Sequence, residues 1–111
     1  MTTRMRWLVA LATVAAFGAG DAASAADIAA GKAKATEICA ACHAADGNSP
    51  TQDFPKLGGQ YGDYLAKALQ EYKNGNRTHP SMRAIAATLS DQDMANLAAY
   101  YAQPDVKTAA K

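Results

Sequence analysis

The sequence predicts an all-α fold in one small domain. Apolar residues recur at helical spacings in several stretches, and no useful length alternates apolar and polar residues as a strand would. Half of the 111 residues are hydrophobic, but alanine dominates this half, with only two Phe and one Trp. Because so few large side chains would fill a core poorly, we expect a cofactor, a metal or a disulfide to complete it.

Residues 1–25 have the organisation of a secretory signal peptide. They have two arginines near the start, at positions 4 and 6, and an apolar run over residues 7–20 that is short for a membrane span. They end with Ala-Ser-Ala at 23–25. A retained membrane anchor is the alternative. We place the cut after Ala25, with a cut after Ala26 as the alternative. Residues 26–111 would then form the domain, exported to a periplasm and without a membrane span.

The remaining domain carries no net charge, because cleavage leaves nine basic and nine acidic residues. It contains no block of like charge that would be typical of an interaction tail. A neutral domain offers no basic surface to a phosphate backbone. We therefore expect no binding to nucleic acid.

The first helix is expected to begin after Asp27, a suitable N-cap, and to run to about Cys39. The apolar and small residues on one of its faces are Ile28, Gly31, Ala35 and Ile38. Residues 44–60 are rich in Gly and Pro and are predicted to form a loop.

A second helix is predicted from about Tyr61 to Lys73, where apolar residues recur at i, i+3, i+4 and i+7. The same spacing predicts that Tyr61, Tyr64 and Tyr72 are mainly core residues. The sequence Asn-Gly-Asn at residues 74–76 would end this helix.

A short helix is expected over Met82–Leu89, followed by a last helix capped by Ser90. Asp93 stands three positions after Ser90, which is the spacing of a capping box. Pro104 closes the last helix. Its apolar stripe consists of Met94, Leu97, Ala98 and Tyr101.

The two cysteines of the chain lie in the sequence Cys39-Ala40-Ala41-Cys42-His43. This is the C-x-x-C-H pattern of haem c attachment. The two thiols add to the two vinyl groups of haem as thioethers, and the adjacent histidine lies beneath the iron as a ligand. One motif predicts one covalently attached haem c, held by Cys39 and Cys42, with His43 as an axial ligand.

Three other interpretations of these cysteines suit the sequence less well. A thioredoxin-like redox pair needs a βαβ context, which is not visible. A zinc site needs further ligands, and beyond the motif only one histidine, His79, remains. A plain disulfide is chemically possible in an exported protein but leaves His43 unexplained.

With this motif at the end of an N-terminal helix, the chain resembles the class I cytochromes c. Gly31 and Ala35 stand where that family has small residues, residues 54–57 (Phe-Pro-Lys-Leu) resemble its proline loop, and Leu97 and Tyr100 match its last helix. The stretches that begin at Gly59 and Leu89 look most like one half of the dihaem cytochromes c4. The resemblance implies four or so helices around one haem, with the first and last helices crossing.

The second axial ligand has three candidates: Met82, Met94 and His79. Met94 lies on the apolar stripe of the last helix, where a methionine usually fills the core. Met82 follows Pro80 in an irregular stretch that could turn its thioether toward iron, and the resembling family has its ligand methionine there. His79 would instead give a bis-histidine haem. We predict Met82, with Met94 and His79 as the alternatives.

Pro55 is predicted to act on the other side of the iron. In the resembling family the carbonyl of this proline accepts the N–H of the iron-bound histidine, which orients the ring and tunes its basicity. The resemblance therefore implies that Pro55 supports His43. The alternative is that Pro55 only stiffens a turn.

A haem with histidine and methionine ligands indicates a soluble electron carrier rather than an enzyme. We expect a monomer that docks transiently with redox proteins of a bacterial-type respiratory or related electron-transport chain. Lys56, Lys67 and Lys73 could form a docking surface, although solvated charges are the simpler interpretation. There are two alternative functions. A haem enzyme or gas sensor would need an open iron position. A fixed subunit of a larger oxidoreductase would use the same chemistry as a free carrier.

Overall fold

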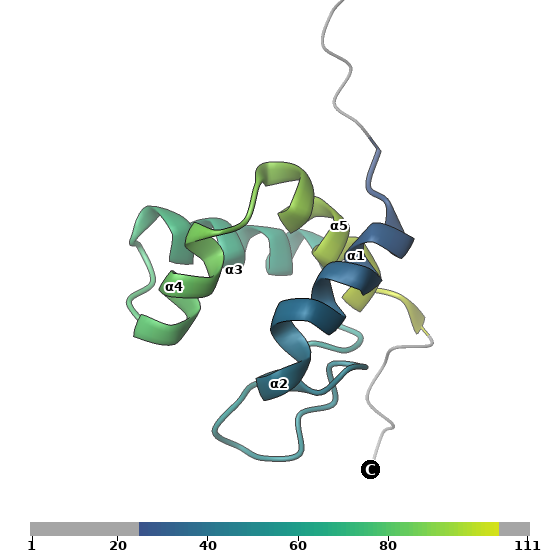
Figure 1. The fold of residues 1–111 in the computed structure, drawn as a ribbon, viewed down its shortest axis with the longest axis horizontal. Helices are drawn as coiled ribbons and strands as arrows, with labels where there is room; N and C mark the ends of the chain where they lie inside the picture. The colour runs from purple at the N-terminus through teal and green to yellow at the C-terminus, as the bar shows by residue number, and fades with distance from the viewer. Residues whose placement is uncertain (1–24, 105–111) are drawn as a thin grey trace, which may run out of the picture.

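The computed structural model describes residues 25–104, which form helices and loops and no strand, as predicted (Figure 1). The predicted signal peptide, apart from its last residue, lies outside the described residues. None of the helices between residues 25 and 104 has the length and apolarity needed to cross a membrane. The elements are α1 (Ile28–Lys34), η1 (Ala35–Cys39), α2 (Ala40–His43), α3 (Gly62–Asn74), α4 (Pro80–Ala87) and α5 (Asp91–Tyr101).

The first and last helices cross at Gly31, as the family resemblance implied (Figure 1). A Cβ on Gly31 would lie 2.1 Å from the carbonyl oxygen of Asn96 and 3.0 Å from the Cβ of Tyr100, so only glycine fits. Asn96 also accepts a hydrogen bond from the backbone N–H of Asp27 through its Oδ1, at 2.7 Å. The start of α1 is thus joined to the middle of α5.

The first helical segment starts where the sequence predicts and extends further. The side chain of Asp27 accepts a hydrogen bond from the N–H of Ala30 and caps α1. The helix then widens into the π-helical turn η1, where the N–H of Ala40 donates to the carbonyl of Ala35, and continues through α2 to His43. One extra residue in a turn rotates everything after it by about 100° relative to α1. The sequence pattern indicated a regular helix with 3.6 residues per turn, which does not predict this rotation.

The core is centred on α5, which supplies most of its buried side chains. The capping box predicted for Ser90 and Asp93 is present, with both reciprocal hydrogen bonds at 3.0 Å. The backbone N–H of Ser90 donates to the Asp93 carboxylate and holds the pKa of that carboxyl below its usual value. The predicted stripe is buried, and α1 and α3 both pack on this helix. The buried residues of α5 are Met94, Asn96, Leu97, Ala98, Tyr100 and Tyr101.

Three predictions of core residues are wrong. Tyr64, on α3, is 46% exposed. Ile28 is 44% exposed, because the first turn of α1 extends beyond the contact at Gly31. Tyr61 is 80% exposed, because it is the N-cap of α3 in an extended conformation, so the helical period does not apply to it. The helix itself is as predicted within one residue and ends at Gly75, which adopts a left-handed conformation with φ 88°.

The short helix α4 begins two residues earlier than predicted, at Pro80. Proline suits the first turn of a helix because its φ is already helical and the N–H it lacks has no partner there. Met82 therefore lies in the first turn of α4 and not in an irregular stretch, which corrects the expectation from sequence. The loop expected before α3 is confirmed, since residues 44–61 contain no helix.

The crossing at Gly31 generates a stability prediction. Gly31→Ala should lower the free energy of unfolding by about 1–3 kcal/mol, because the added Cβ meets backbone that cannot rotate away. Gly62→Ala is the matched control, since its Cβ would find ordinary contacts at 3.5 Å. Denaturant unfolding of both variants measures the difference. Equal stabilities would contradict the close approach of α1 and α5.

Candidate haem-binding site

A cavity of about 350 Å³ lies between the first helical segment, the 44–61 loop, α3, α4 and α5. All five residues predicted to hold or support haem line it. The larger part of the wall is apolar, with Leu65, Leu69, Ile85 and Leu97 among its residues. Cavities of this size and lining are typical of cofactor sites. The predicted site residues in its wall are Cys39, Cys42, His43, Pro55 and Met82.

His43 is buried and held in one orientation. Its Nδ1 lies 2.7 Å from the carbonyl oxygen of Pro55. Because a carbonyl oxygen can only accept, Nδ1 must carry the proton, which leaves the lone pair of Nε2 available for a metal ion. The ring of Phe54 packs edge-on against the imidazole, with centroids 6.2 Å apart. Pro55 thus makes the contact that the resemblance implied.

The chain turns sharply after His43. Ala44 has φ 65° and ψ 160°, a conformation that essentially only glycine adopts without strain. The loop that follows is tied back to α5, since the hydroxyl of Tyr100 donates to the carbonyl of Ala45 and the N–H of Gly59 donates to the carbonyl of Tyr101. These contacts bring Pro55 back to His43.

Cys39 and Cys42 are both free thiols, so the disulfide alternative is not what the structure contains. Cys42 is exposed and Cys39 is half-buried. Burial raises the pKa of the Cys39 thiol, an effect that the neighbouring Tyr101 hydroxyl partly opposes. The thiol therefore stays protonated at neutral pH.

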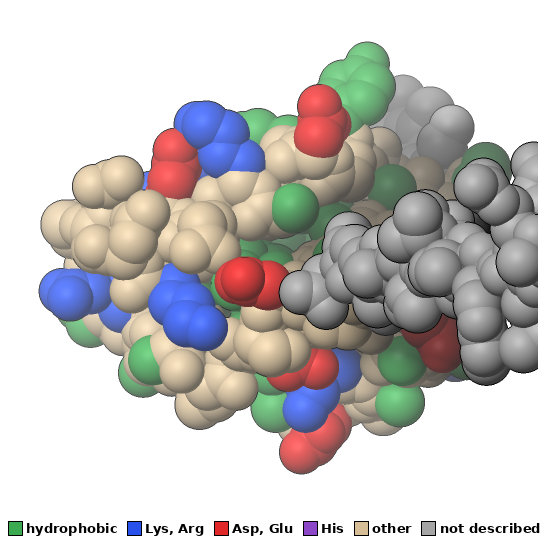
Figure 2. Space-filling model, turned by 90° about the horizontal axis from the view of Figure 1, so that it is seen from above, with side chains coloured by type: hydrophobic (Ala, Val, Ile, Leu, Met, Phe, Trp, Pro, Cys, Tyr) green, Lys and Arg blue, Asp and Glu red, His purple; other side chains and the backbone are tan. Residues whose placement is uncertain are grey.

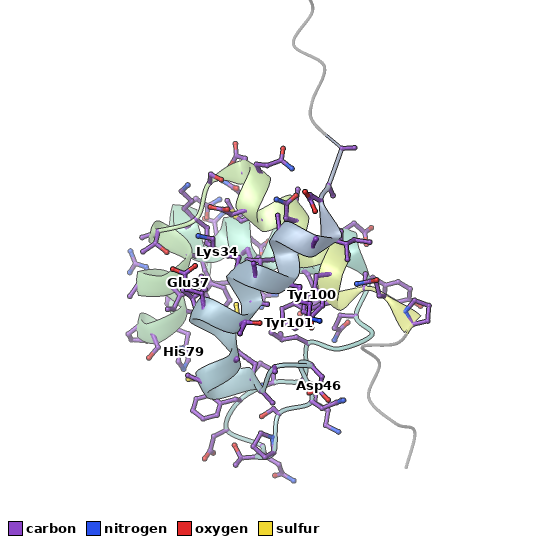
Figure 3. The ribbon with its side chains drawn as sticks, turned by 45° about the vertical axis from the view of Figure 1, so that its right-hand side comes forward. Lys34, Glu37, Asp46, His79, Tyr100 and Tyr101 are labelled. Carbon is purple, nitrogen blue, oxygen red and sulfur yellow. The ribbon has the colours of Figure 1, made fainter. Side chains whose placement is uncertain are left out.

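Tyr101 reaches this cavity from the end of α5, where its ring packs against that of Tyr100 at 5.0 Å (Figure 3). It is only 3% exposed, and its hydroxyl has no hydrogen-bond partner among the described residues. Burial, followed by the proximity of Cys39, raises the pKa of this phenol far above its usual value. The cavity thus contains a neutral hydroxyl that can still donate a hydrogen bond.

The three candidates for the second iron ligand lie in different places. Met94 is buried in the core and is absent from the cavity wall, as expected of a core methionine. Met82 is half-buried and lines the cavity from α4. His79 is the exposed N-cap of α4, and it too lines the cavity rather than lying in a loop away from it (Figure 3).

The lysines and tyrosines singled out from the sequence mostly have partners within the chain. Lys67 pairs with Glu71 at 2.5 Å, and Lys73 Nζ donates to the carbonyl of Leu89. Tyr64 and Tyr72 line the cavity. On the face shown in Figure 2, basic and acidic side chains are interspersed, without a broad area of one sign.

The residues present fit haem c. The cavity brings two thiols, an imidazole with a free Nε2 and a thioether to one apolar space, and these are the donor types that a covalent, low-spin haem requires. The unpartnered Tyr101 hydroxyl adds a polar group that a bound cofactor can satisfy. An apolar cavity of this size in an alanine-rich domain would otherwise be costly.

Comparisons with known proteins agree with this site. Residues 28–103 match the cytochrome c family, and the chain belongs to that family. It is 53% identical over 83 residues to cytochrome c4 of Pseudomonas aeruginosa, covering 75% of this chain and 41% of that protein. It is 38% identical over 82 residues to cytochrome c-554(548) of Halomonas halodenitrificans, covering 71% of this chain and 98% of that protein.

Among solved structures, reduced recombinant cytochrome c4 from Pseudomonas stutzeri matches with a TM-score of 0.66 at 42% identity. The match covers 70% of this chain and 45% of that one. The predicted class I fold is therefore confirmed, and so is the likeness to one half of a cytochrome c4. The chain spans less than half the length of these cytochrome c4 relatives. As a family member with one C-x-x-C-H motif, it carries one covalently bound haem c.

The conformation of Ala44 generates a second prediction. Ala44→Gly should raise the free energy of unfolding by about 1 kcal/mol, because relief of about 1–3 kcal/mol of backbone strain exceeds the entropic cost of glycine. Ala45→Gly is the control and should lose about 0.5–1 kcal/mol, since Ala45 has no positive φ to relieve. Denaturant unfolding of the haem-loaded proteins measures both. If the two variants lose stability equally, Ala44 is not strained.

Proposed function

We propose that this protein is an exported electron carrier that passes single electrons between redox proteins. The observation that carries the proposal is the single cavity in which the C-x-x-C-H motif, the bond from His43 to Pro55 and the thioether-bearing helix α4 meet. The likeness to cytochromes over nearly the whole domain supports it. No substrate bond changes in such a reaction, so the proposal is of a carrier and not of an enzyme.

The proposed haem-binding residues have two different roles. Cys39 and Cys42 would supply the two thioether sulfurs, while Nε2 of His43 and the sulfur of Met82 would be the two axial ligands. Haem c, when bound, supplies an iron that alternates between its ferric and ferrous states. The soft sulfur of Met82 favours the ferrous state and would raise the potential.

The surrounding residues limit what else can happen at the iron. The carbonyl of Pro55 fixes the tautomer of His43 and makes its Nε2 a better donor. The apolar wall excludes water, and Met82 would occupy the position that a gas or peroxide would need. We propose further that residues 1–25 direct export to the periplasm, and that the domain works as a monomer with brief, weak docking.

The first test of this proposal is covalent attachment. Cys39→Ala and Cys42→Ala should each weaken or abolish the haem stain on a denaturing gel, because each removes one thioether. The double variant should also lack a cooperative unfolding transition by circular dichroism, since bound cofactor stabilises the fold. A wild-type protein made with an active attachment system but without a stained band would contradict the proposal. So would a double variant as stable as wild type.

The second test is the identity of the axial ligand. Met82→Ala should lower the midpoint potential, shift the ferric spectrum toward high spin and allow the reduced protein to bind carbon monoxide. Met94→Ala, which removes a core side chain, should keep the spectrum and lose about 2–5 kcal/mol of stability. His79→Ala should keep the spectrum as well. A high-spin spectrum in either of these two variants, with Met82→Ala unchanged, would reassign the ligand.

A further inference from the structure

The helix that carries Met82 has little buried surface of its own. Within α4 only Ala86 is buried, and Leu89 follows just after its end. Met82 itself is only half-buried. A short helix with so few buried contacts opens easily, so its position depends on other contacts. The connection of residues 75–79, which joins α3 to α4, is where such contacts occur.

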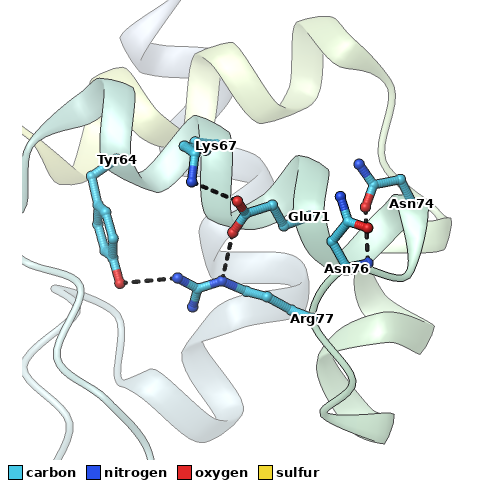
Figure 4. A network of polar contacts seen from close by, with 6 residues as sticks. All are labelled: Tyr64, Lys67, Glu71, Asn74, Asn76 and Arg77. Carbon is cyan, nitrogen blue, oxygen red and sulfur yellow. Dashed lines mark hydrogen bonds and ion pairs between the residues drawn. The ribbon is translucent and has the colours of Figure 1, made fainter.

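One side chain of this connection, Arg77, is tied to α3 at several points (Figure 4). Its Nε donates to Glu71 Oε2 at 2.8 Å, and its backbone N–H donates to the carbonyl oxygen of Glu71 at 3.0 Å. Its Nη2 lies 3.4 Å from the hydroxyl of Tyr64. The other carboxylate oxygen of Glu71 accepts from Lys67 at 2.5 Å. We call these four residues the Arg77 clamp.

Two aromatic rings support the same guanidinium. Its central carbon lies 5.7 Å from the ring centroid of Tyr64 and 5.5 Å from that of Tyr72, both on α3. The hydrogen bond with Glu71 raises the pKa of Arg77, and Lys67 and Arg77 together lower the pKa of the Glu71 carboxyl. The contact thus favours the charged form of both side chains. A planar guanidinium with several partners holds a geometry that one isolated ion pair would not.

The clamp lies on the same cavity as the proposed iron ligand. Arg77, Tyr64 and Tyr72 line its wall together with Met82. Five positions along the chain separate Arg77 from Met82, and Pro80 stiffens the path between them. Fixing Arg77 on α3 therefore restricts where the first turn of α4 can lie.

We propose that Arg77 is a positioning residue: by fastening the α3–α4 connection to α3, the Arg77 clamp holds Met82 at the iron. This inference rests on the proposed ligation by Met82. Without the clamp, a larger fraction of molecules has α4 displaced and Met82 away from the iron. An external ligand binds only that fraction, so its apparent dissociation constant falls in proportion as the fraction rises.

The experiment is a titration of the ferric, haem-loaded protein with imidazole, followed by absorbance. Imidazole competes with Met82 for the iron. Arg77→Gln should bind imidazole about tenfold more tightly than wild type. Arg83→Gln is the matched control, because it removes the same charge from α4, one residue from Met82, but outside the clamp. Its imidazole affinity should stay within about twofold of wild type.

Two further variants separate the geometry of the clamp from its charge. Arg77→Lys keeps the charge but loses the planar fork, so it should show most of the gain in imidazole affinity. Glu71→Gln weakens the clamp from the other side and should show a gain as well. Because both residues act through one contact, the double variant Arg77→Gln/Glu71→Gln should gain little beyond Arg77→Gln alone. If Arg77→Gln fails to fold, Glu71→Gln carries the same test with the arginine in place.

The outcomes distinguish this inference from the proposed function. A ferric haem with a methionine ligand has a weak sulfur-to-iron charge-transfer band in its absorption spectrum. If wild type lacks this band, or if Met82→Ala retains it, the proposed ligation by Met82 is wrong and the clamp has no ligand to hold. If that band behaves as expected but Arg77→Gln binds imidazole like wild type, only the clamp is overturned. An equal gain in imidazole affinity in Arg83→Gln would likewise overturn the inference about the clamp, and so would an unchanged, wild-type affinity in Arg77→Lys. Either result would make charge alone the cause.

Discussion

The close approach of α1 and α5 at Gly31 is the contact on which the rest of the structure depends. It brings two backbones so near that a side chain on Gly31 would meet the Asn96 carbonyl. The helix that leaves this crossing carries the C-x-x-C-H motif at its other end. Because only glycine permits this close crossing, Gly31 also determines where Cys39 and His43 lie relative to α3 and α4.

The cavity beside this crossing explains how so alanine-rich a chain forms a stable domain. The buried core is small and gathered on α5, with only Leu89 and Leu97 among its fully buried large side chains. The apolar cavity of about 350 Å³ beside this core would give a bound haem contacts with side chains that otherwise have few partners. Bound haem c would thus complete the apolar core as well as serve as the redox group.

The two sides of the proposed iron site are held in different ways. His43 is buried, bonded to Pro55 and followed by a strained residue, so its ring has one available orientation. Met82 lies on a short helix with one buried residue, and in our proposal the Arg77 clamp steadies it from the α3–α4 connection. A carrier benefits from this difference. In the proposed site, Cys39 and Cys42 would attach the haem and His43 would hold one side of the iron, while the lightly held Met82 would set the potential through how firmly its sulfur stays at the iron.

Much of this protein was determined by local sequence. The motif from Cys39 to His43, the cap at Asp27 and the capping box at Ser90 are short-range patterns whose chemistry does not depend on the rest of the chain. What the sequence could not show depends on contacts between distant segments. The π-helical turn before Cys39 rotates the motif, Tyr61 sits outside its helix, and Met82 enters the first turn of α4. Arg77 gave no local signal either, because a lone arginine in a connection acquires its contacts only when α3 lies beside it. Tertiary packing decides these features, because each depends on contacts between distant segments, and the helical periodicity of one segment does not predict such contacts.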